Sequence, residues 1–112
     1  MTKQEASQRY NSPIWLLDEY ESWGLCQEGQ YGDGDLERLS MMITLHDVGF
    51  TDREVETYMR LLLEGEHTAL QRMQMLNRRR DHALDEIHFK EAQLARLDYL
   101  RHNIKNTTNQ KS

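Results

Sequence analysis

The sequence predicts a mainly all-α protein, in which a small N-terminal helical lobe precedes one long helix that forms a coiled coil. In the first 64 residues, polar helix-capping residues stand directly before short apolar segments. From about residue 66 to residue 106, neither glycine nor proline interrupts a pattern of apolar residues that repeats every seven positions. We therefore divide the 112 residues into a lobe (1–64), a coiled-coil helix (65–106) and a polar tail (107–112).

Two short helices are expected at the N-terminus. Thr2 and Glu5 have the spacing of a capping box, which predicts a helix over about residues 3–10. Ser12 is the expected N-cap of the second helix, with Pro13 at its first position, where a missing N–H group costs nothing. Gly24 is expected to end this helix. Two short helices joined by a tight connection are typical of a helix-turn-helix.

A glycine-rich segment and two more helices complete the predicted lobe. Residues 26–34 contain three glycines and predict a turn or a very small hairpin. Asp35 is the expected N-cap of a helix that ends at Gly49. Thr51 begins a second capping box, and Gly65 separates the helix that follows from the long helix.

The long helix carries a seam of residues spaced alternately three and four positions apart, beginning at Ala69. A helix of this length spans about 60 Å, so the small lobe leaves most of the seam uncovered. A second copy of the chain is the simplest cover, which predicts a homodimer. The predicted interface consists of Met73, Leu76, Arg80, Ala83, Ile87, Lys90, Leu94, Leu97, Arg101 and Ile104.

The cations of the seam favour an antiparallel pair over a parallel one. In a parallel pair Arg80, Lys90 and Arg101 would each face its own copy, and contact between like charges is costly. In the antiparallel pair that we favour, the residue numbers of two facing residues add up to 177. Arg80 of one chain, for example, then faces Leu97 of the other. No cation then meets its own copy, and the long side chains reach outward to water.

Negative charge is concentrated at the N-terminal end of the chain. The formal net charge is −5, and residues 1–40 hold three basic residues against eight acidic ones, whereas residues 41–112 hold eleven of each. An acidic surface repels phosphate groups, so this distribution is unfavourable for binding nucleic acid.

Several strings resemble, in order and spacing, the MerR family of bacterial transcriptional regulators. The resemblance implies a winged helix-turn-helix lobe at each end of an antiparallel coiled coil, in a dimer that reads promoter DNA and responds to an effector. The matching strings are Thr2-Lys3-Gln4-Glu5-Ala6, Tyr20-Glu21 with Gly24-Leu25, Asp35-Leu36-Glu37-Arg38-Leu39, Gly49-Phe50-Thr51 with Glu54-Val55, and Leu97-Asp98-Tyr99.

The resemblance also shows where this chain departs from the family. The family commonly has an arginine where this chain has Asp18 and an aromatic residue where it has Glu19. Its wing is longer and basic, whereas the nine residues 26–34 contain no lysine or arginine. These departures leave open an alternative: a MerR-like protein that is impaired in DNA binding and acts as an interaction or heterodimerisation partner. The candidate DNA contacts are Lys3, Arg9, Trp15, Tyr20 and Arg38. Tyr20 is a candidate by resemblance, but its position beside Leu16 and Leu17 favours a half-buried side chain instead.

The two tryptophans of the second helix have different expected roles. Trp23 is expected to be a core residue. Trp15 is either exposed and functional or packed against the lobe, and the sequence does not decide between the two.

No motif for catalysis, a cofactor or a metal ion is recognised, so we expect no enzyme and no cofactor. The five histidines show no i, i+4 pairing, so a metal site would require a coincidence of the tertiary structure. Cys26, the single cysteine, is a candidate oxidant sensor, but no cation next to it in the sequence would lower its pKa, which favours an incidental thiol. The basic run 78–80 is expected to be a solvated, ion-paired face. Without a signal peptide or a long apolar run, a cytoplasmic protein outside the membrane is expected.

Overall fold

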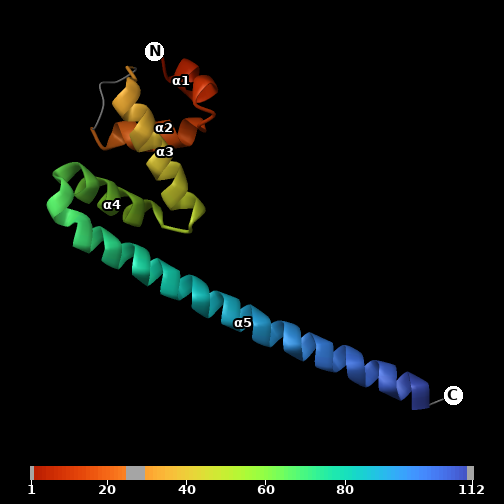
Figure 1. Cartoon of the computed structure of the whole chain (residues 1–112). Coiled ribbons are helices and arrows are strands. Elements are labelled where there is room, and N and C mark those ends of the chain that lie inside the picture. Colours follow the sequence, from red (N-terminus) through yellow and green to blue (C-terminus); the bar gives the residue numbers. More distant parts are fainter. Residues whose placement is uncertain (1, 25–29, 111–112) are drawn as a thin grey trace. The chain divides into compact units, whose positions relative to one another are not determined.

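The computed structural model describes residues 2–24 and 30–110, except for the side chains of residues 109 and 110, and the described ranges are helical with short connections and no strand. This confirms the all-α prediction. Residues 26–29 of the predicted turn at residues 26–34, and Cys26 with them, lie outside these ranges. In chain order (Figure 1), the elements are α1 (Lys3–Arg9), α2 (Ile14–Ser22), α3 (Asp33–Asp47), α4 (Asp52–Glu64), the 3-10 helix η1 (Glu66–Thr68) and α5 (Ala69–Gln110).

The chain divides into two compact units, Met1–Met75 and Leu76–Ser112. The first unit extends beyond the lobe boundary expected at residue 64 and includes the first turns of α5. Among the described helices, none combines the length and the apolar character that crossing a membrane requires.

Two threonines cap their helices as predicted. The hydroxyl of Thr2 accepts a hydrogen bond from the backbone N–H of Glu5 at 3.2 Å, at the start of α1. At the start of α4, the hydroxyl of Thr51 accepts from the N–H of Glu54 at 3.2 Å, and the Glu54 carboxylate accepts from the N–H of Thr51 at 2.9 Å. These bonds satisfy N–H groups that the first turn of a helix leaves without partners.

The predicted cap of α2 is wrong by one residue. Pro13 is the N-cap, with φ −67° and ψ 149°, and its carbonyl accepts from the N–H of Leu16 at 3.1 Å. Ser12 is buried instead, and its hydroxyl donates to the carbonyl of Tyr10 at 3.4 Å. The carbonyl of Ser12 accepts from the hydroxyl of Ser7 at 2.6 Å, so Ser12 ties the end of α1 to the connection.

The predicted cap of α3 is also wrong. Gly32 is the N-cap, and Asp35 is the third residue of the helix, where its carboxylate accepts from the backbone N–H of Gly32 at 2.9 Å. Asp33 and Gly34, which were expected in the turn, therefore form the first residues of α3. The carboxylate does supply the capping interaction, but it does so from inside the helix.

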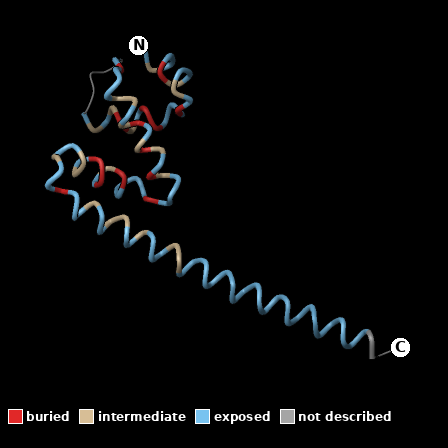
Figure 2. Tube along the Cα trace, viewed as in Figure 1, coloured by how far each residue is buried: buried red, intermediate tan, exposed pale blue. Residues whose placement is uncertain are grey.

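The core of the first unit is built from one face of each of the helices α1 to α4, and Figure 2 shows its buried residues in red. Trp23 is not among them: it is the C-cap of α2 and is only half-buried, so the prediction of a core tryptophan is wrong. The rings of Phe50 and Tyr58 meet edge to face, with centroids 6.1 Å apart. The apolar core consists of Ala6, Leu16, Leu17, Tyr20, Tyr31, Leu39, Met42, Leu45, Phe50, Val55, Tyr58 and Met59.

A buried threonine holds the connection between α4 and α5. Gly65 has a φ of 125°, which favours glycine, and it ends α4 where predicted. The Thr68 hydroxyl lies 2.7 Å from the carbonyl oxygen of Leu61 and 2.8 Å from that of Gly65, and it accepts from Nε–H of Arg72 at 3.0 Å. The single proton and one lone pair of this buried hydroxyl are therefore hydrogen-bonded inside the first unit.

The second unit consists of α5 from Leu76 onward, and every residue from 85 to 108 is exposed. In Figure 2 this part of the tube is pale blue almost throughout. The apolar seam residues Ile87, Leu94, Leu97 and Ile104 are between 51% and 69% exposed. The helix continues to Gln110, so the tail expected from residue 107 is largely helical.

Candidate nucleic-acid interface

The helix-turn-helix consists of α1 and α2, and the burial pattern of α2 defines its outer face. Leu16, Leu17 and Tyr20 are completely buried and hold the helix in the core. Trp15 and Asp18 are exposed, the former to 54%. The outer face of the second helix therefore offers an indole ring and a carboxylate, and no lysine or arginine lies within α2.

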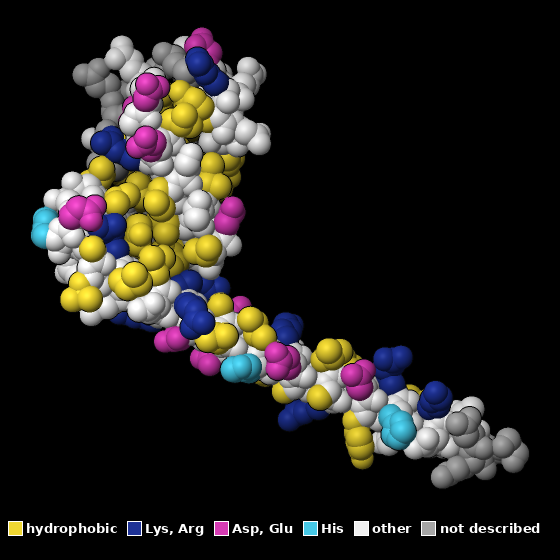
Figure 3. Space-filling model, in the orientation of Figure 1, with side chains coloured by type: hydrophobic (Ala, Val, Ile, Leu, Met, Phe, Trp, Pro, Cys, Tyr) yellow, Lys and Arg dark blue, Asp and Glu magenta, His cyan; other side chains and the backbone are white. Residues whose placement is uncertain are grey.

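Lys3, a predicted DNA contact, is paired with acidic side chains of α2. Its ammonium nitrogen lies 2.5 Å from Oδ1 of Asp18 and 3.0 Å from Oε2 of Glu21. The hydrogen bonds that Lys3 donates to Asp18 and Glu21 raise the pKa of Lys3 above its ordinary value. Figure 3 likewise shows magenta carboxylates close to dark blue basic side chains on the drawn face of the first unit. The charge of Lys3 is thus largely compensated within the lobe.

Two more predicted contacts, Tyr20 and Arg38, lie together in a separate group. The Tyr20 hydroxyl donates to Oδ1 of Asp35 at 2.5 Å and accepts from Nη1 of Arg38 at 3.2 Å. Nη1 of Arg38 also lies 3.6 Å from Oδ1 of Asp35. Burial raises the pKa of Tyr20 to about 12. Tyr20 therefore joins α2 to α3 from the interior and presents no surface in this conformation.

Arg9 and Trp15 are the two predicted contacts that remain open to solvent. Arg9 is exposed in the last turn of α1 and forms no ion pair with any other described residue. The Trp15 ring meets the His46 ring edge to face, with centroids 5.2 Å apart and planes at 81°. The structure thus distributes the five predicted residues over separate places and does not gather them into one basic patch.

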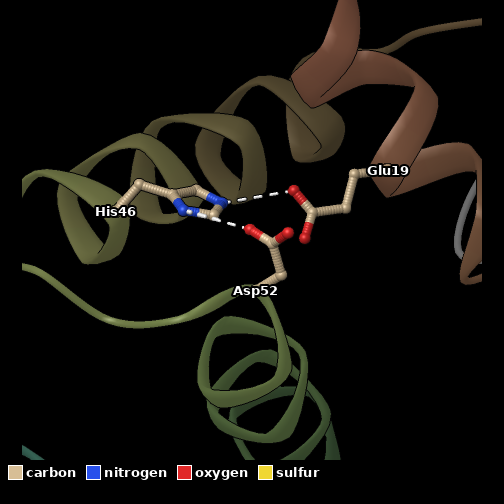
Figure 4. A group of neighbouring side chains, drawn as sticks. All are labelled: Glu19, His46 and Asp52. Atoms are coloured by element: carbon tan, nitrogen blue, oxygen red, sulfur yellow. Dashed lines mark hydrogen bonds and ion pairs between the residues drawn. The ribbon is translucent and has the colours of Figure 1, made fainter.

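A group that sequence reasoning missed joins α2, α3 and α4 (Figure 4). Nε2 of His46 lies 3.2 Å from Oε2 of Glu19, and Nδ1 of His46 lies 3.8 Å from Oδ1 of Asp52. Burial raises the pKa of Glu19, and its hydrogen bond with His46 acts in the opposite direction. No spacing pattern marked these residues, because Glu19 and His46 are 27 positions apart and lie on different helices.

Comparison with known proteins shows which fold these helices form. No protein-family model matches the sequence, and a search of curated proteins found no match. A crystal structure does match: that of a protein from Listeria monocytogenes described as a MerR family transcriptional regulator, at 21% identity and a TM-score of 0.66. The match covers 100% of this chain and 99% of that chain, so it includes both the lobe and the long helix. The chain therefore has the fold of a MerR-type regulator, as the sequence strings predicted.

Proposed function

We propose that this protein is a homodimeric transcriptional regulator of the MerR type, which binds promoter DNA through α1 and α2. The observation that carries the proposal is the shared fold along the full length of the chain. A fold alone does not define a function. The dimer and the DNA contact are therefore each supported by exposed residues of the chain.

The exposed seam of α5 supports the homodimer. Its apolar residues from Ile87 to Ile104 are more than half exposed in a single chain, and burying each such side chain contributes about 1.5–3 kcal/mol when burial is complete. A second copy with the same seam buries both sets at once. The antiparallel arrangement remains the favoured one, since it keeps Arg80, Lys90 and Arg101 away from their own copies.

Arg9 and Trp15 support direct DNA contact. An exposed arginine beside the second helix of a helix-turn-helix is suited to a phosphate contact, which positions the protein without reading sequence. Because Lys3 and Arg38 already interact with carboxylates, few cations are available, and selectivity would rest substantially on DNA shape.

The same ion pairs favour a second candidate function, that of a MerR-like interaction partner with weak or no DNA binding. Asp18 and Glu21 place negative charge on α2, the helix that would face the DNA. Such a protein would pair with a DNA-binding relative through α5, or offer its acidic lobe to a basic partner protein.

Fluorescence anisotropy with duplexes from the protein's own promoter region distinguishes the two candidates. The regulator is expected to bind one duplex selectively over a scrambled one, with an affinity that falls steeply as salt rises. Arg9→Ala should reduce the salt slope by about one, whereas Arg96→Ala, an exposed arginine of α5 outside the seam, should leave it unchanged. Absence of binding even at low salt would refute direct regulation and favour the interaction partner.

Charge reversal at Asp18 provides a second test of the docking face. Asp18→Arg replaces a carboxylate on the exposed face of α2 by a cation and removes one of the two carboxylates that pair with Lys3. Both changes should strengthen DNA association if α2 enters the groove. Unchanged affinity across a range of salt would show that this face does not approach DNA.

A further inference from the structure

Three potential metal ligands meet where α2, α3 and α4 come together (Figure 4). Glu19 extends from α2, His46 lies in the last turn of α3, and Asp52 is the first residue of α4. One ligand atom from each residue can be chosen so that all three lie within 4.8 Å of one another. We propose that this group binds a divalent transition-metal ion such as Zn²⁺.

The distance between the first two ligands fits a shared ion. Ligand atoms that lie about 2.0–2.2 Å from one metal ion, at angles near 90–110°, are separated by about 3.0–3.5 Å. Oε2 of Glu19 and Nε2 of His46 are 3.2 Å apart. Oδ1 of Asp52 lies 3.8 Å from Nδ1, the other ring nitrogen, so the Asp52 carboxylate has to rotate to reach an ion bound at Nε2, and its 84% exposed side chain leaves room for that rotation. Glu19 and His46 are each only 16% exposed in their side chains, which gives the site two fixed ligands and one adjustable ligand.

The electrostatics of the group favour a cation independently of the distances. Within the described ranges, His46 is the only basic residue that pairs with Glu19 or Asp52. Neither carboxylate is paired with a lysine or an arginine of these ranges. Asp52 and Glu56 both repel the negative charge of Glu19. A single imidazole carries at most one positive charge and so does not balance two carboxylates, whereas a divalent ion does.

The ligand types indicate the class of ion. One imidazole and two carboxylates form a nitrogen and oxygen set without thiolate, which suits Zn²⁺, Co²⁺, Ni²⁺ or Mn²⁺ rather than Cu⁺. Three protein ligands leave at least one coordination position for water or an exogenous ligand. The bound ion would link α2, the second helix of the helix-turn-helix, to α3 and α4, and would thereby fix its orientation.

Isothermal titration calorimetry of the full chain with Zn²⁺ measures binding at the site directly. We expect one high-affinity ion per chain, and His46→Gln should weaken binding by more than the roughly 10- to 100-fold that loss of an outer hydrogen-bond partner costs. His82→Gln is the matched control, because His82 and Glu86 form an exposed pair 3.7 Å apart, and no third potential ligand joins them among the described residues. Equal binding by the wild type and His46→Gln, or equal loss in His82→Gln, would overturn the proposal.

Asp52→Asn is a second variant that tests the site if His46→Gln does not fold. It is expected to fold, because the Asp52 side chain is mostly exposed. It should retain the circular dichroism spectrum of the wild type while losing Zn²⁺ affinity, and unchanged affinity would count against the site. Trp15 supplies a local signal, because its ring lies 5.2 Å from that of His46. In Trp23→Phe, paramagnetic Co²⁺ or Ni²⁺ should quench the remaining fluorescence of Trp15, and His46→Gln should abolish the quenching.

A regulatory consequence rests on the proposed DNA-binding function and is tested separately. Zn²⁺ at saturating concentration should change the anisotropy-derived affinity for promoter DNA in the wild type and not in His46→Gln. An ion that binds at the site without changing DNA affinity would refute the regulatory link. Loss of DNA binding under all conditions would instead refute the proposed function, because ion binding is measured without DNA.

Discussion

Leu97→Ala is expected to weaken the proposed dimer about 30-fold. Complete burial of a leucine side chain contributes about 1.5–3 kcal/mol, and Leu97 is 57% exposed in the single chain. Covering that fraction contributes about 1–1.7 kcal/mol, of which alanine retains about a third, so about 1 kcal/mol is lost per side chain. A twofold dimer contains the residue twice, and about 2 kcal/mol corresponds to about a 30-fold rise in the dissociation constant.

Leu100→Ala is the matched control, because Leu100 is also 57% exposed but lies outside the seam. Sedimentation equilibrium over a range of protein concentrations gives the dissociation constant of each variant. Leu100→Ala should change it much less than Leu97→Ala does. Equal weakening by the two substitutions would refute the seam, and an unchanged constant for Leu97→Ala would refute a dimer formed through this face of α5.

Three further predictions concern direction, pH and helix capping. To test the direction of the helices, Met73→Cys and Ile104→Cys are each made in a chain without other cysteines. A mixture of the two proteins should form a disulfide between them, and neither protein should form one with itself. A disulfide between two copies of the same variant would indicate parallel helices. Burial raises the pKa of Tyr20 to about 12 in the folded chain, against about 10 in the unfolded chain. The neutral phenol should therefore stabilise the fold by about 2–3 kcal/mol below pH ~10, and this contribution should be lost as the pH rises toward about 12. Urea unfolding should therefore show a steeper alkaline loss for the wild type than for Tyr20→Phe, and parallel curves would contradict the reasoning. Thr51→Ala should lower the free energy of unfolding by about 1 kcal/mol, while Thr57→Ala, in the middle of the same helix, should have little effect; similar losses would argue against the cap.

The fold was predictable because its determinants are local. Thr2 and Thr51 each bond to a backbone N–H three residues ahead, and this chemistry is visible in the spacing of the sequence. At Ser12 the cap is shifted by one residue, to Pro13, and at Asp35 it is shifted by three residues, to Gly32. Sequence spacing locates the start of a helix to within a few residues, but it does not decide which of several nearby residues takes the capping position.

The candidate sites were less predictable, because they depend on contacts between helices. Tyr20 was a candidate DNA contact by resemblance, while its position beside Leu16 and Leu17 favoured partial burial, and the structure buries it completely. Glu19, His46 and Asp52 meet only after α2, α3 and α4 have packed together. The seam of α5 remains a prediction, since testing it requires the partner chain.

The ion pair of Lys3 has a consequence for how DNA binding would respond to salt. Asp18 and Glu21 act as built-in counterions, held at 2.5 Å and 3.0 Å. If Lys3 turns to a phosphate group, it exchanges one anionic partner for another and causes less net uptake or release of ions than a solvated lysine does. The number of phosphate contacts derived from a salt titration would then be too small. In the double variant Asp18→Asn, Glu21→Gln, the affinity for DNA should fall more steeply with salt, and the derived number should approach the true number of phosphate contacts.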